Sequence, residues 1–301
     1  MSDQQKSISS TGFIIALLGT VFFSTKAIFV KLAFKAVHID AITLLMLRML
    51  FSLPFYLIIA VRSGRKENNR KLTSKQWFYI FLMGILGYYL SSLFDFIGLQ
   101  YVSAGLERLI LFLYPTFAVL LNTFVFKTKL NKIQAIALVL TYMGIGIAFV
   151  GELKADTSNP DFYFGSFMVF LCAVTYSFYI VGTGKIVGSI GVSKYTAYVM
   201  LFATAGIFIH YALTRDYHSV HFTESIIGYS LALAIIATVL PSFMMSYGMK
   251  QIGSNNVAII TSIGPVSTIL QAYFILGENI LPLQLAGTLL VVVGVILIGK
   301  Q

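Results

Sequence analysis

Long apolar runs, separated by short polar connections, dominate the chain from one end to the other. Ten such runs can be marked, at residues 12–34, 39–61, 76–98, 103–126, 131–150, 163–186, 194–213, 225–247, 254–276 and 282–299. Each is close to the length of about 20 residues that an α-helix needs to cross the hydrocarbon core of a bilayer. The pattern predicts an all-α membrane protein with ten transmembrane helices and no separate soluble domain.

The second half of this pattern repeats the first at an interval of 150 residues. Four uncommon landmarks keep the register without a gap: Gly98 with Gly248, Pro115 with Pro265, Gln134 with Gln284, and Gly144 with Gly294. From Ser92 to Gly151 only 9 of 60 positions are identical, so the landmarks weigh more than the identity. We predict a duplicated five-helix unit, with a first repeat at 12–151 and a second at 163–300.

The odd number of helices per repeat fixes how the two halves sit in the membrane. Because each repeat crosses the bilayer five times, the second must lie inverted relative to the first. Inverted repeats generally enclose a substrate path at their interface, near the midplane. The sequence therefore predicts a central cavity between two inverted repeats.

Charged residues are scarce and unevenly placed. They make up 11% of the chain, against 58% hydrophobic residues, whereas a soluble domain has about 25% charged residues. With the N-terminus in the cytoplasm, 14 Lys and Arg residues fall on the cytoplasmic side and three on the other, in keeping with the positive-inside rule. Both termini are thus expected in the cytoplasm, and the net charge of +10 reflects topology rather than a nucleic-acid partner.

Cysteine and histidine give no sign of a disulfide or a metal site. Cys172 is the single cysteine and lies within an apolar run, and no Cys and His residues have metal-ligand spacing. We expect no metal and no cofactor. The polar N-terminal segment leads into the first apolar run without a small-residue cleavage site, so that run is expected to remain as a helix.

Six charged residues fall inside the apolar runs, all in the outer half of the first repeat: Lys26, Lys31, Arg48, Asp95, Glu107 and Arg108. A charge in the hydrocarbon costs about 2.5–3.5 kcal/mol on insertion scales, so each needs a partner or a water-filled cavity. Lys31 is expected to reach the outer interface with its long side chain. Glu107 and Arg108 are adjacent, about 100° apart on a helix, so one of them is also expected near the interface.

The remaining intramembrane charges favour a cavity. Lys26 is the hardest to explain structurally, because a neutral residue there would cost less; we expect it to line a cavity. Arg48 is either a strut that pairs with Asp95 or backbone carbonyls, or a substrate contact. Asp95 shares a helix face with Tyr88 and Ser92, a polar stripe that favours an aqueous path.

Hydroxyl side chains form further stripes in the second repeat: Tyr176, Tyr179 and Thr183, then Ser242 and Ser246 near Pro241, and Thr261 and Ser262 near Pro265. Hydrogen bonding between helices is the ordinary use of such hydroxyls, and ligand contact is the alternative. Proline frees a backbone carbonyl that can bind a ligand or admit a kink. Gly287, Gly294 and Gly299 are expected to let the last helix approach a neighbour closely, within the bundle or in a weak homodimer.

These features together resemble the EamA branch of the drug/metabolite transporter superfamily. The residues that carry the resemblance are Ala104-Gly105 and Ser254-Asn255 at the starts of two runs, the mid-run Pro115 and Pro265, and Gly277-Glu278 followed by Gln284, Gly287 and Gly294. The chain departs from the family pattern at Lys127-Thr128, where Gly-Glu is common, and at Glu107-Arg108, where small or apolar residues are usual. The resemblance implies an exporter or exchanger of amino acids, metabolites or drugs.

The expected function is secondary transport by alternating access, without enzymatic activity. A mixture of buried charges suits an amino acid or similar zwitterion, exported across the bacterial inner membrane, with lipids as the other partner. The candidate substrate-binding residues are Lys26, Arg48, Tyr88, Asp95, Arg108, Tyr176, Tyr179, Ser246 and Thr261, and the candidate proton carriers are Asp95 and Glu107.

Three alternatives remain at the level of sequence. The first is an organic-anion or drug exporter of the same fold, with Lys26 and Arg48 facing the anion. The second is a membrane-embedded enzyme, for which Lys26 and Asp95 are the acid–base candidates. The third is a channel or an interaction scaffold, which saturable exchange would exclude.

Overall fold

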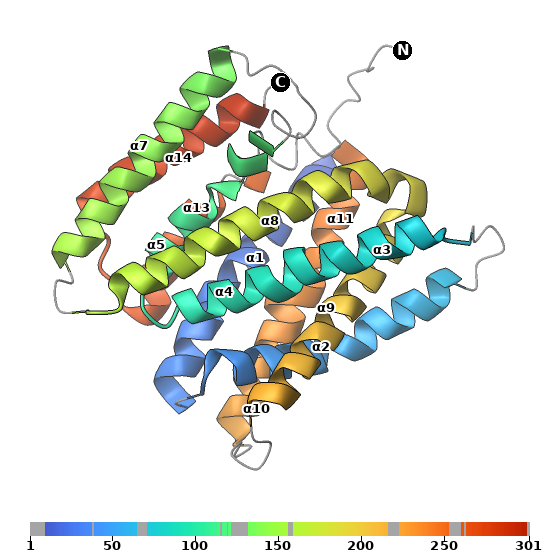
Figure 1. The fold of residues 1–301 in the computed structure, drawn as a ribbon. Helices are drawn as coiled ribbons and strands as arrows, with labels where there is room; N and C mark the ends of the chain where they lie inside the picture. The colour runs from blue at the N-terminus through green and yellow to red at the C-terminus, as the bar shows by residue number, and fades with distance from the viewer. Residues whose placement is uncertain are drawn as a thin grey trace.

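The chain folds almost entirely into helices. The computed structural model describes residues 10–37, 39–64, 71–114, 116–118, 120–121, 132–155, 159–215, 223–252, 260–261 and 263–299. Its helices (Figure 1) are α1 (Ser10–Val37), α2 (Ala41–Gly64), α3 (Ser74–Gly84), η1 (Ile85–Leu90), α4 (Ser91–Gly98), α5 (Ala104–Leu111), α7 (Lys132–Ala155), α8 (Phe162–Ile190), α9 (Val192–Thr214), α10 (Glu224–Ala234), η3 (Ile235–Val239), α11 (Leu240–Ile252), α13 (Gly264–Gln271), η4 (Ala272–Leu276) and α14 (Pro282–Gly299).

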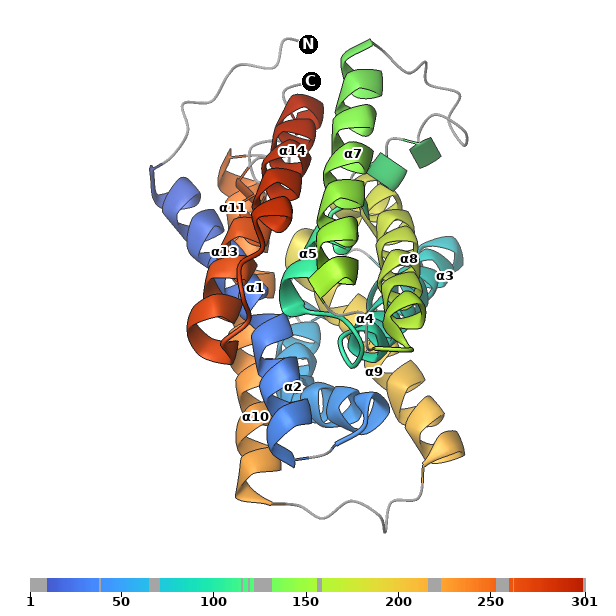
Figure 2. The same cartoon turned by 90° about the vertical axis from the view of Figure 1, so that its left-hand side faces the viewer.

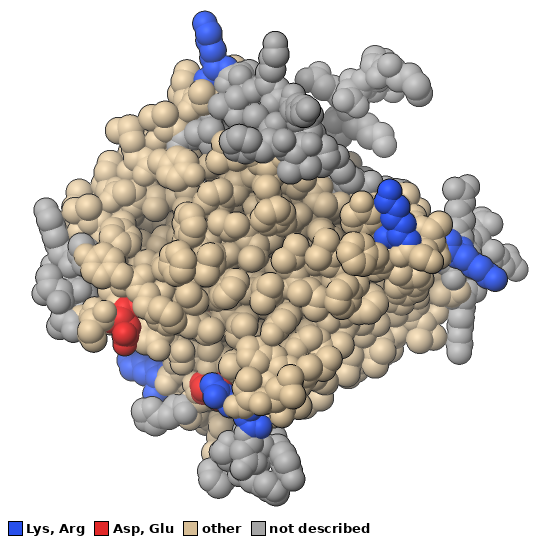
Figure 3. All heavy atoms as spheres, viewed as in Figure 1, with Lys and Arg blue, Asp and Glu red and all other residues tan. Residues whose placement is uncertain are grey.

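Much of this helical bundle has the length and surface of a membrane protein. Among the described residues, six helical stretches are long and apolar enough to cross a bilayer: 10–37, 41–64, 74–98, 162–183, 192–214 and 224–245. The shorter apolar helices in the same part of the chain are 139–151, 264–276 and 282–294. Large apolar side chains point outward, among them Leu213 at 80% and Phe274 at 77% exposure. Figure 3 shows a broad uncharged face with charged side chains at its margins. The chain is thus an integral, multi-pass membrane protein.

The helices pair in a reciprocal way between the two halves of the chain. α1 packs on α10, α11 and α13, whereas α8 packs on α3, α4 and α5. α2 packs on α9, and α7 packs on α14 along their length, which both views show (Figures 1 and 2). The largest apolar core lies among α1, α2 and α4 of the first half and α9 and α10 of the second.

Glycines bring α7 and α14 close together. A Cβ placed on Gly144 would lie 2.5 Å from the carbonyl oxygen of Gly287 and 2.9 Å from Leu290 Cβ. No side chain other than hydrogen fits between these backbones, so the absence of a Cβ permits the contact. Gly287 therefore serves packing within the bundle.

Two helices are interrupted where the sequence pattern predicts continuous spans. The run 103–126 is expected as one helix, but α5 ends at Leu111 and a turn follows at residues 112–113. A proline at position 115 has no N–H, so the carbonyl of Leu111 lacks its helical donor. In the second half a turn residue, Ile263, precedes α13, which carries Pro265 in its first turn, a position that suits proline.

Two further helices contain a π-helical segment at matching places. η1 begins at Ile85 and η3 begins at Ile235, 150 residues later. Each segment joins two α-helical pieces, α3 to α4 and α10 to α11. Such π-bulges insert a residue into the helix and occur frequently at functional sites.

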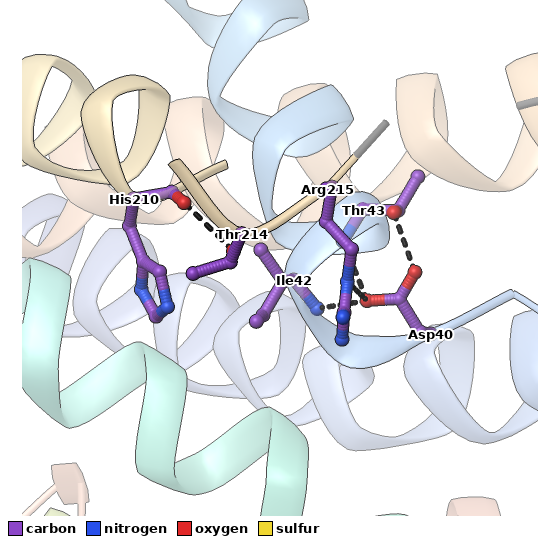
Figure 4. Close-up of polar contacts among 6 residues, drawn as sticks. All are labelled: Asp40, Ile42, Thr43, His210, Thr214 and Arg215. Carbon is purple, nitrogen blue, oxygen red and sulfur yellow. Dashed lines mark hydrogen bonds and ion pairs between the residues drawn. The ribbon is translucent and has the colours of Figure 1, made fainter. Parts of the chain in front are cut away.

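At one end of the bundle an ion pair joins α2 to α9 (Figure 4). Asp40 caps α2 by accepting hydrogen bonds from the Ile42 and Thr43 amides, at 3.0 and 3.2 Å, and from the Thr43 hydroxyl at 2.5 Å. Arg215 Nε, just beyond α9, lies 3.1 Å from Asp40 Oδ1. Partial burial of Asp40 opposes ionisation, but the bonds from Thr43 and Arg215 outweigh it and lower the pKa of this carboxyl below its ordinary 3.8. Asp40 therefore remains ionised at neutral pH and available to pair with Arg215.

Other contacts link the connections at the two ends of the bundle. A hollow of about 390 Å³ beside the ion pair is lined by Phe34, Ile39, Asp40 and Gln100. Backbone and side-chain hydrogen bonds join the α4–α5 connection to two others: Asn159 Nδ2 to the Tyr101 carbonyl at 2.7 Å, and the Ala104 amide to Glu278 Oε1 at 3.2 Å. At a different connection, Gln76 Nε2 donates to Ser189 Oγ at 3.4 Å, tying the start of α3 to the end of α8.

Candidate functional site

Three of the buried charges meet in one cluster between α1, α4 and α5. Lys26 Nζ lies 2.8 Å from Asp95 Oδ2 and 3.6 Å from Glu107 Oε1. The exposed fractions of the three residues are 8%, 1% and 0%. One ammonium group is thus shared by two carboxylates, and the attraction is strong because little solvent screens it. We call these three residues the Lys26 cluster.

Arg48 makes a different kind of contact. Its Nη2 donates a hydrogen bond to Ser92 Oγ at 2.9 Å, and its guanidinium lies over the Phe96 ring at 4.8 Å from the centroid. The Nε atom is buried and has no hydrogen-bond partner among the described residues. Arg48 is therefore held by α4 through a neutral hydroxyl and an aromatic face, rather than by a close ion pair with Asp95.

Arg108 is buried, contrary to the expectation that either it or Glu107 reaches the interface. Their exposed fractions are 4% and 0%. Both are buried because α5 is enclosed on several sides, packing on α1, α7, α8, α13 and α14. Glu107 faces Lys26, while the Arg108 guanidinium lies over the rings of Phe23 and Phe112, 5.2 and 5.5 Å from their centroids.

Arg108 also reaches the start of α13. A Cβ on Gly264 would lie 2.8 Å from Arg108 Nη2 and 3.2 Å from its Nε. The Nε atom is buried without a hydrogen-bond partner among the described residues. Burying an ion costs several kcal/mol, whereas a cation–π contact returns about 0.5–2 kcal/mol. The rings therefore offset only part of the cost of burying this guanidinium.

A row of tyrosines runs from the Arg48 region toward α13. Ring centroids are 5.1 Å apart for Tyr88 and Tyr179, 5.6 Å for Tyr179 and Tyr176, and 5.1 Å for Tyr176 and Tyr114. The Tyr88 and Tyr179 side chains share a hydrogen bond, and Tyr114 shares one with Thr261. Four hydroxyl-bearing rings thus connect three helical segments of the two halves.

The structure places most of the sequence-predicted residues in contact with at least one other of them, in the groups described above. Lys26, Asp95 and Glu107 form the Lys26 cluster, and Arg48 joins the stripe of Tyr88 and Ser92. Tyr176, Tyr179 and Thr261 belong to the tyrosine row, and Arg108 lies between α5 and α13. Ser246 is part of α11, but its side chain lies outside the described residues. Lys31 is only partly buried, unlike the other five intramembrane charges.

Sequence reasoning did not identify several residues that shape this site: Phe23, Phe96, Phe112, Tyr114 and Gly264. One signal was available for some of them, because Phe112 follows Arg108 by four positions and Phe23 precedes Lys26 by three. Residues at these intervals share a helix face. The contact between Arg108 and Gly264 had no such signal, since it joins positions 156 residues apart.

The five buried charges found among the described residues do not balance. Lys26, Arg48 and Arg108 supply three positive charges, and Asp95 and Glu107 supply two negative ones, which leaves one positive charge in excess. All five lie in α1, α2, α4 and α5, on the first half of the chain. This arrangement can hold both an ammonium group, at the two carboxylates, and an anionic group, at the cations. The one positive charge in excess favours the anionic group.

Comparisons with known proteins agree with a transport fold. A model of the EamA-like transporter family matches residues 10–150 and 163–300. Among curated proteins, the chain is 30% identical to "Uncharacterized transporter YcbK" of Bacillus subtilis over 285 residues, covering 93% of this chain and 89% of that one. It is 23% identical to "Uncharacterized transporter YyaM" of the same species, covering 80% and 78%. One crystal structure, 18% identical, superposes with a TM-score of 0.65 over 96% of each chain, a likeness that shows the fold.

Proposed function

Because the chain belongs to the EamA-like transporter family, we propose that it is a secondary transporter that moves an amino acid or similar zwitterion outward across the bacterial inner membrane by alternating access. We propose a zwitterion because the described residues include five buried charges of both signs. Membrane interiors bury charge only where a partner or a ligand offsets the cost. Transport, rather than catalysis, is the activity proposed.

The reciprocal packing supports two inverted five-helix repeats at 12–151 and 163–300, with ten spans in all. α1 and α8 occupy equivalent places, each packed on the third and fourth spans of the other half. The π-segments η1 and η3 lie 150 residues apart, at the interval of the sequence repeat. Repeats of this kind supply two equivalent arrangements, open to one side or to the other.

The end contacts support the proposed grouping of the connections on two sides, and the Lys and Arg count assigns the side of both termini to the cytoplasm. In that topology residues 38–40, 99–103, 156–161, 215–223 and 277–281 lie outside. The contacts Asp40–Arg215, Asn159–Tyr101 and Ala104–Glu278 each join two of these connections or their edges. Gln76 and Ser189, both assigned to the cytoplasmic side, contact each other as well.

Within this site we propose the following division of roles. Asp95 and Glu107 would accept the ammonium end of the substrate when Lys26 moves away, and one of them would carry a proton. Arg48, Tyr88, Tyr176, Tyr179, Ser246 and Thr261 would line the path between the repeats. Lys26 holds both carboxylates in the closed arrangement, at 2.8 and 3.6 Å.

Counterflow in proteoliposomes tests the proposal. Vesicles containing the purified chain are preloaded with one unlabelled solute and given the same labelled solute, across amino acids, organic acids and cationic drugs. We expect saturable accumulation for a zwitterion, and at least a tenfold loss, equal to about 1.4 kcal/mol, in Asp95→Asn. Lys132→Met, at an exposed position, is the control and should match the wild type.

Other outcomes would assign a different function. Flux that rises linearly with concentration, without counterflow, would indicate a channel. A chemically altered solute would indicate an enzyme. Accumulation of organic acids that lack an amine would favour the second candidate, an organic-anion exporter, for which the excess positive charge is the supporting observation.

A further inference from the structure

We infer that the substrate carries a carboxylate and that this group binds Arg108 beside the first turn of α13. The inference rests on the transport function proposed above and names the part of the site that holds the negative end of the substrate. Of the three buried cations, Lys26 alone has a carboxylate within 4 Å among the described residues.

Lys26 and Arg48 are already engaged. Lys26 lies within 2.8 and 3.6 Å of two carboxylates, and Arg48 donates to Ser92 Oγ at 2.9 Å. Arg108 contacts two aromatic faces, has a buried Nε with no hydrogen-bond partner, and makes no ion pair within the described part of the chain. A guanidinium carries five N–H donors in a planar fork that matches a carboxylate. Arg48 likewise has a buried Nε without a partner and no close carboxylate among the described residues, but its Nη2 already donates to Ser92. Arg108, held against two aromatic faces, is therefore the cation that we assign to the carboxylate.

The surroundings of Arg108 also favour an anion. Its guanidinium lies against Gly264, the first residue of α13, where a Cβ would be 2.8 Å from Nη2. A helix N-terminus carries a partial positive charge and unsatisfied N–H groups. Two positive features thus face the same place without an anion between them. A ligand carboxylate there would interact favourably with both.

The excess of positive charge favours an anionic group at this place. Among the described residues, the buried charges leave an excess of one positive charge. The carboxylate of a zwitterion meets this excess while its ammonium end meets Asp95 and Glu107. The position also joins α5 of the first half to α13 of the second, so a bound carboxylate would couple the two halves.

The first experiment probes this subsite without knowing the substrate. Thermal unfolding of the purified full-length chain is followed while acetate is titrated against acetamide, with chloride keeping the ionic strength constant. A binder of the native state raises the melting temperature in a saturable way. We expect acetate to do so and acetamide not to, with the acetate shift reduced at least fivefold in Arg108→Met. Arg62→Met, at an exposed arginine, should keep the full shift.

A second variant covers the case in which Arg108→Met does not fold. Gly264→Ala places a methyl group against the guanidinium and leaves the arginine present, and it should also reduce the acetate shift. Equal shifts with acetate and acetamide in the wild type, or an undiminished acetate shift in Arg108→Met, would overturn the inference.

The transport assay separates this inference from the proposed function. For any amino acid that shows counterflow, its amide should be transported at least tenfold less well by the wild type. Counterflow of acid and amide at equal rates would overturn the carboxylate subsite while leaving the transporter intact. A specific acetate shift without counterflow of any solute would support the subsite and refute the proposed function.

Discussion

At the scale of single residues, the chain uses three ways to bury a positive charge. Lys26 faces two carboxylates, Arg48 donates to a hydroxyl, and Arg108 lies between two rings. Hydropathy and depth identify all three as unusual, and they rank Lys26 highest. Hydropathy and depth do not indicate which residues lie next to one another in space. The pairing of Lys26 with Glu107 and the burial of Arg108 therefore follow only from how α5 packs in the structure.

Removing the positive charge of the Lys26 cluster should be strongly destabilising. Lys26→Met leaves Asp95 and Glu107 buried with no close cation, and breaking a buried pair costs about 3–5 kcal/mol. Thermal unfolding in detergent should show this loss, and a second change, Asp95→Asn, should restore part of it by removing one carboxylate. Lys132→Met, exposed on α7, should stay within about 0.5 kcal/mol of the wild type. Equal stability of Lys26→Met and the wild type would mean that the cluster is hydrated.

At the scale of helices, the apolar runs predict most elements to within a few residues. The run 282–299 coincides with α14, and the run 76–98 with the stretch Ser74–Gly98. The interruption after Leu111 and the π-segments were not predictable in this way. The interruption and the π-segments depend on which backbone carbonyl accepts the hydrogen bond of each N–H group. Hydropathy carries no information on that pairing. Proline at position 115 gave only a partial signal, because it marks a freed carbonyl but not the place of the turn.

The contact between α7 and α14 predicts opposite effects for two neighbouring glycines. Gly144→Ala should destabilise the protein by about 1–3 kcal/mol, as overpacking does, because the new Cβ meets the Gly287 carbonyl at 2.5 Å. Gly146→Ala meets nothing within 4 Å and should be neutral or stabilising by about 0.5–1 kcal/mol, from the helix propensity of alanine. Unfolding midpoints of the two variants measure the difference. The same change in both midpoints would contradict the close approach.

At the scale of the whole molecule, the five buried charges of the described residues are sealed from solvent, and an ion pair joins the two halves of the chain at the end that carries Asp40. Arg215 and Asp40 join α9 to α2, and both side chains are about 40% exposed, so the pair contributes no more than about 1 kcal/mol. An ion pair this weak opposes separation of the two connections only slightly. The duplicated pattern and the landmarks at 150-residue spacing predict two repeats, and nothing in the sequence indicated the ion pair between Asp40 and Arg215.

Locking this end should stop transport. In a Cys172→Ala background, Asp40→Cys and Arg215→Cys are joined by a short, reducible thiol cross-linker across the place of the ion pair. Counterflow should fall at least tenfold when the linker is present and return after reduction, because alternating access requires the halves to separate at each end in turn. Either single cysteine variant, treated in the same way, should keep its activity. Undiminished counterflow in the cross-linked protein would show that this end does not open during transport.

The π-segment η1 makes the site sensitive to the number of residues in its helix, as well as to their identity. Asp95 lies beyond Ile85–Leu90 in the same continuous span. Because the bulge takes up one extra residue locally, deleting a residue within it would restore regular α-helix with little change in the helix beyond. Adding one residue directly after η1 would instead turn everything beyond it by about 100°, which would swing Asp95 away from Lys26 and Ser92 away from Arg48. Such an insertion would abolish both contacts while every side chain named in the site is still present. An insertion in this helix is therefore a more severe test of the fold than a substitution, and the same argument applies to η3 in the second half.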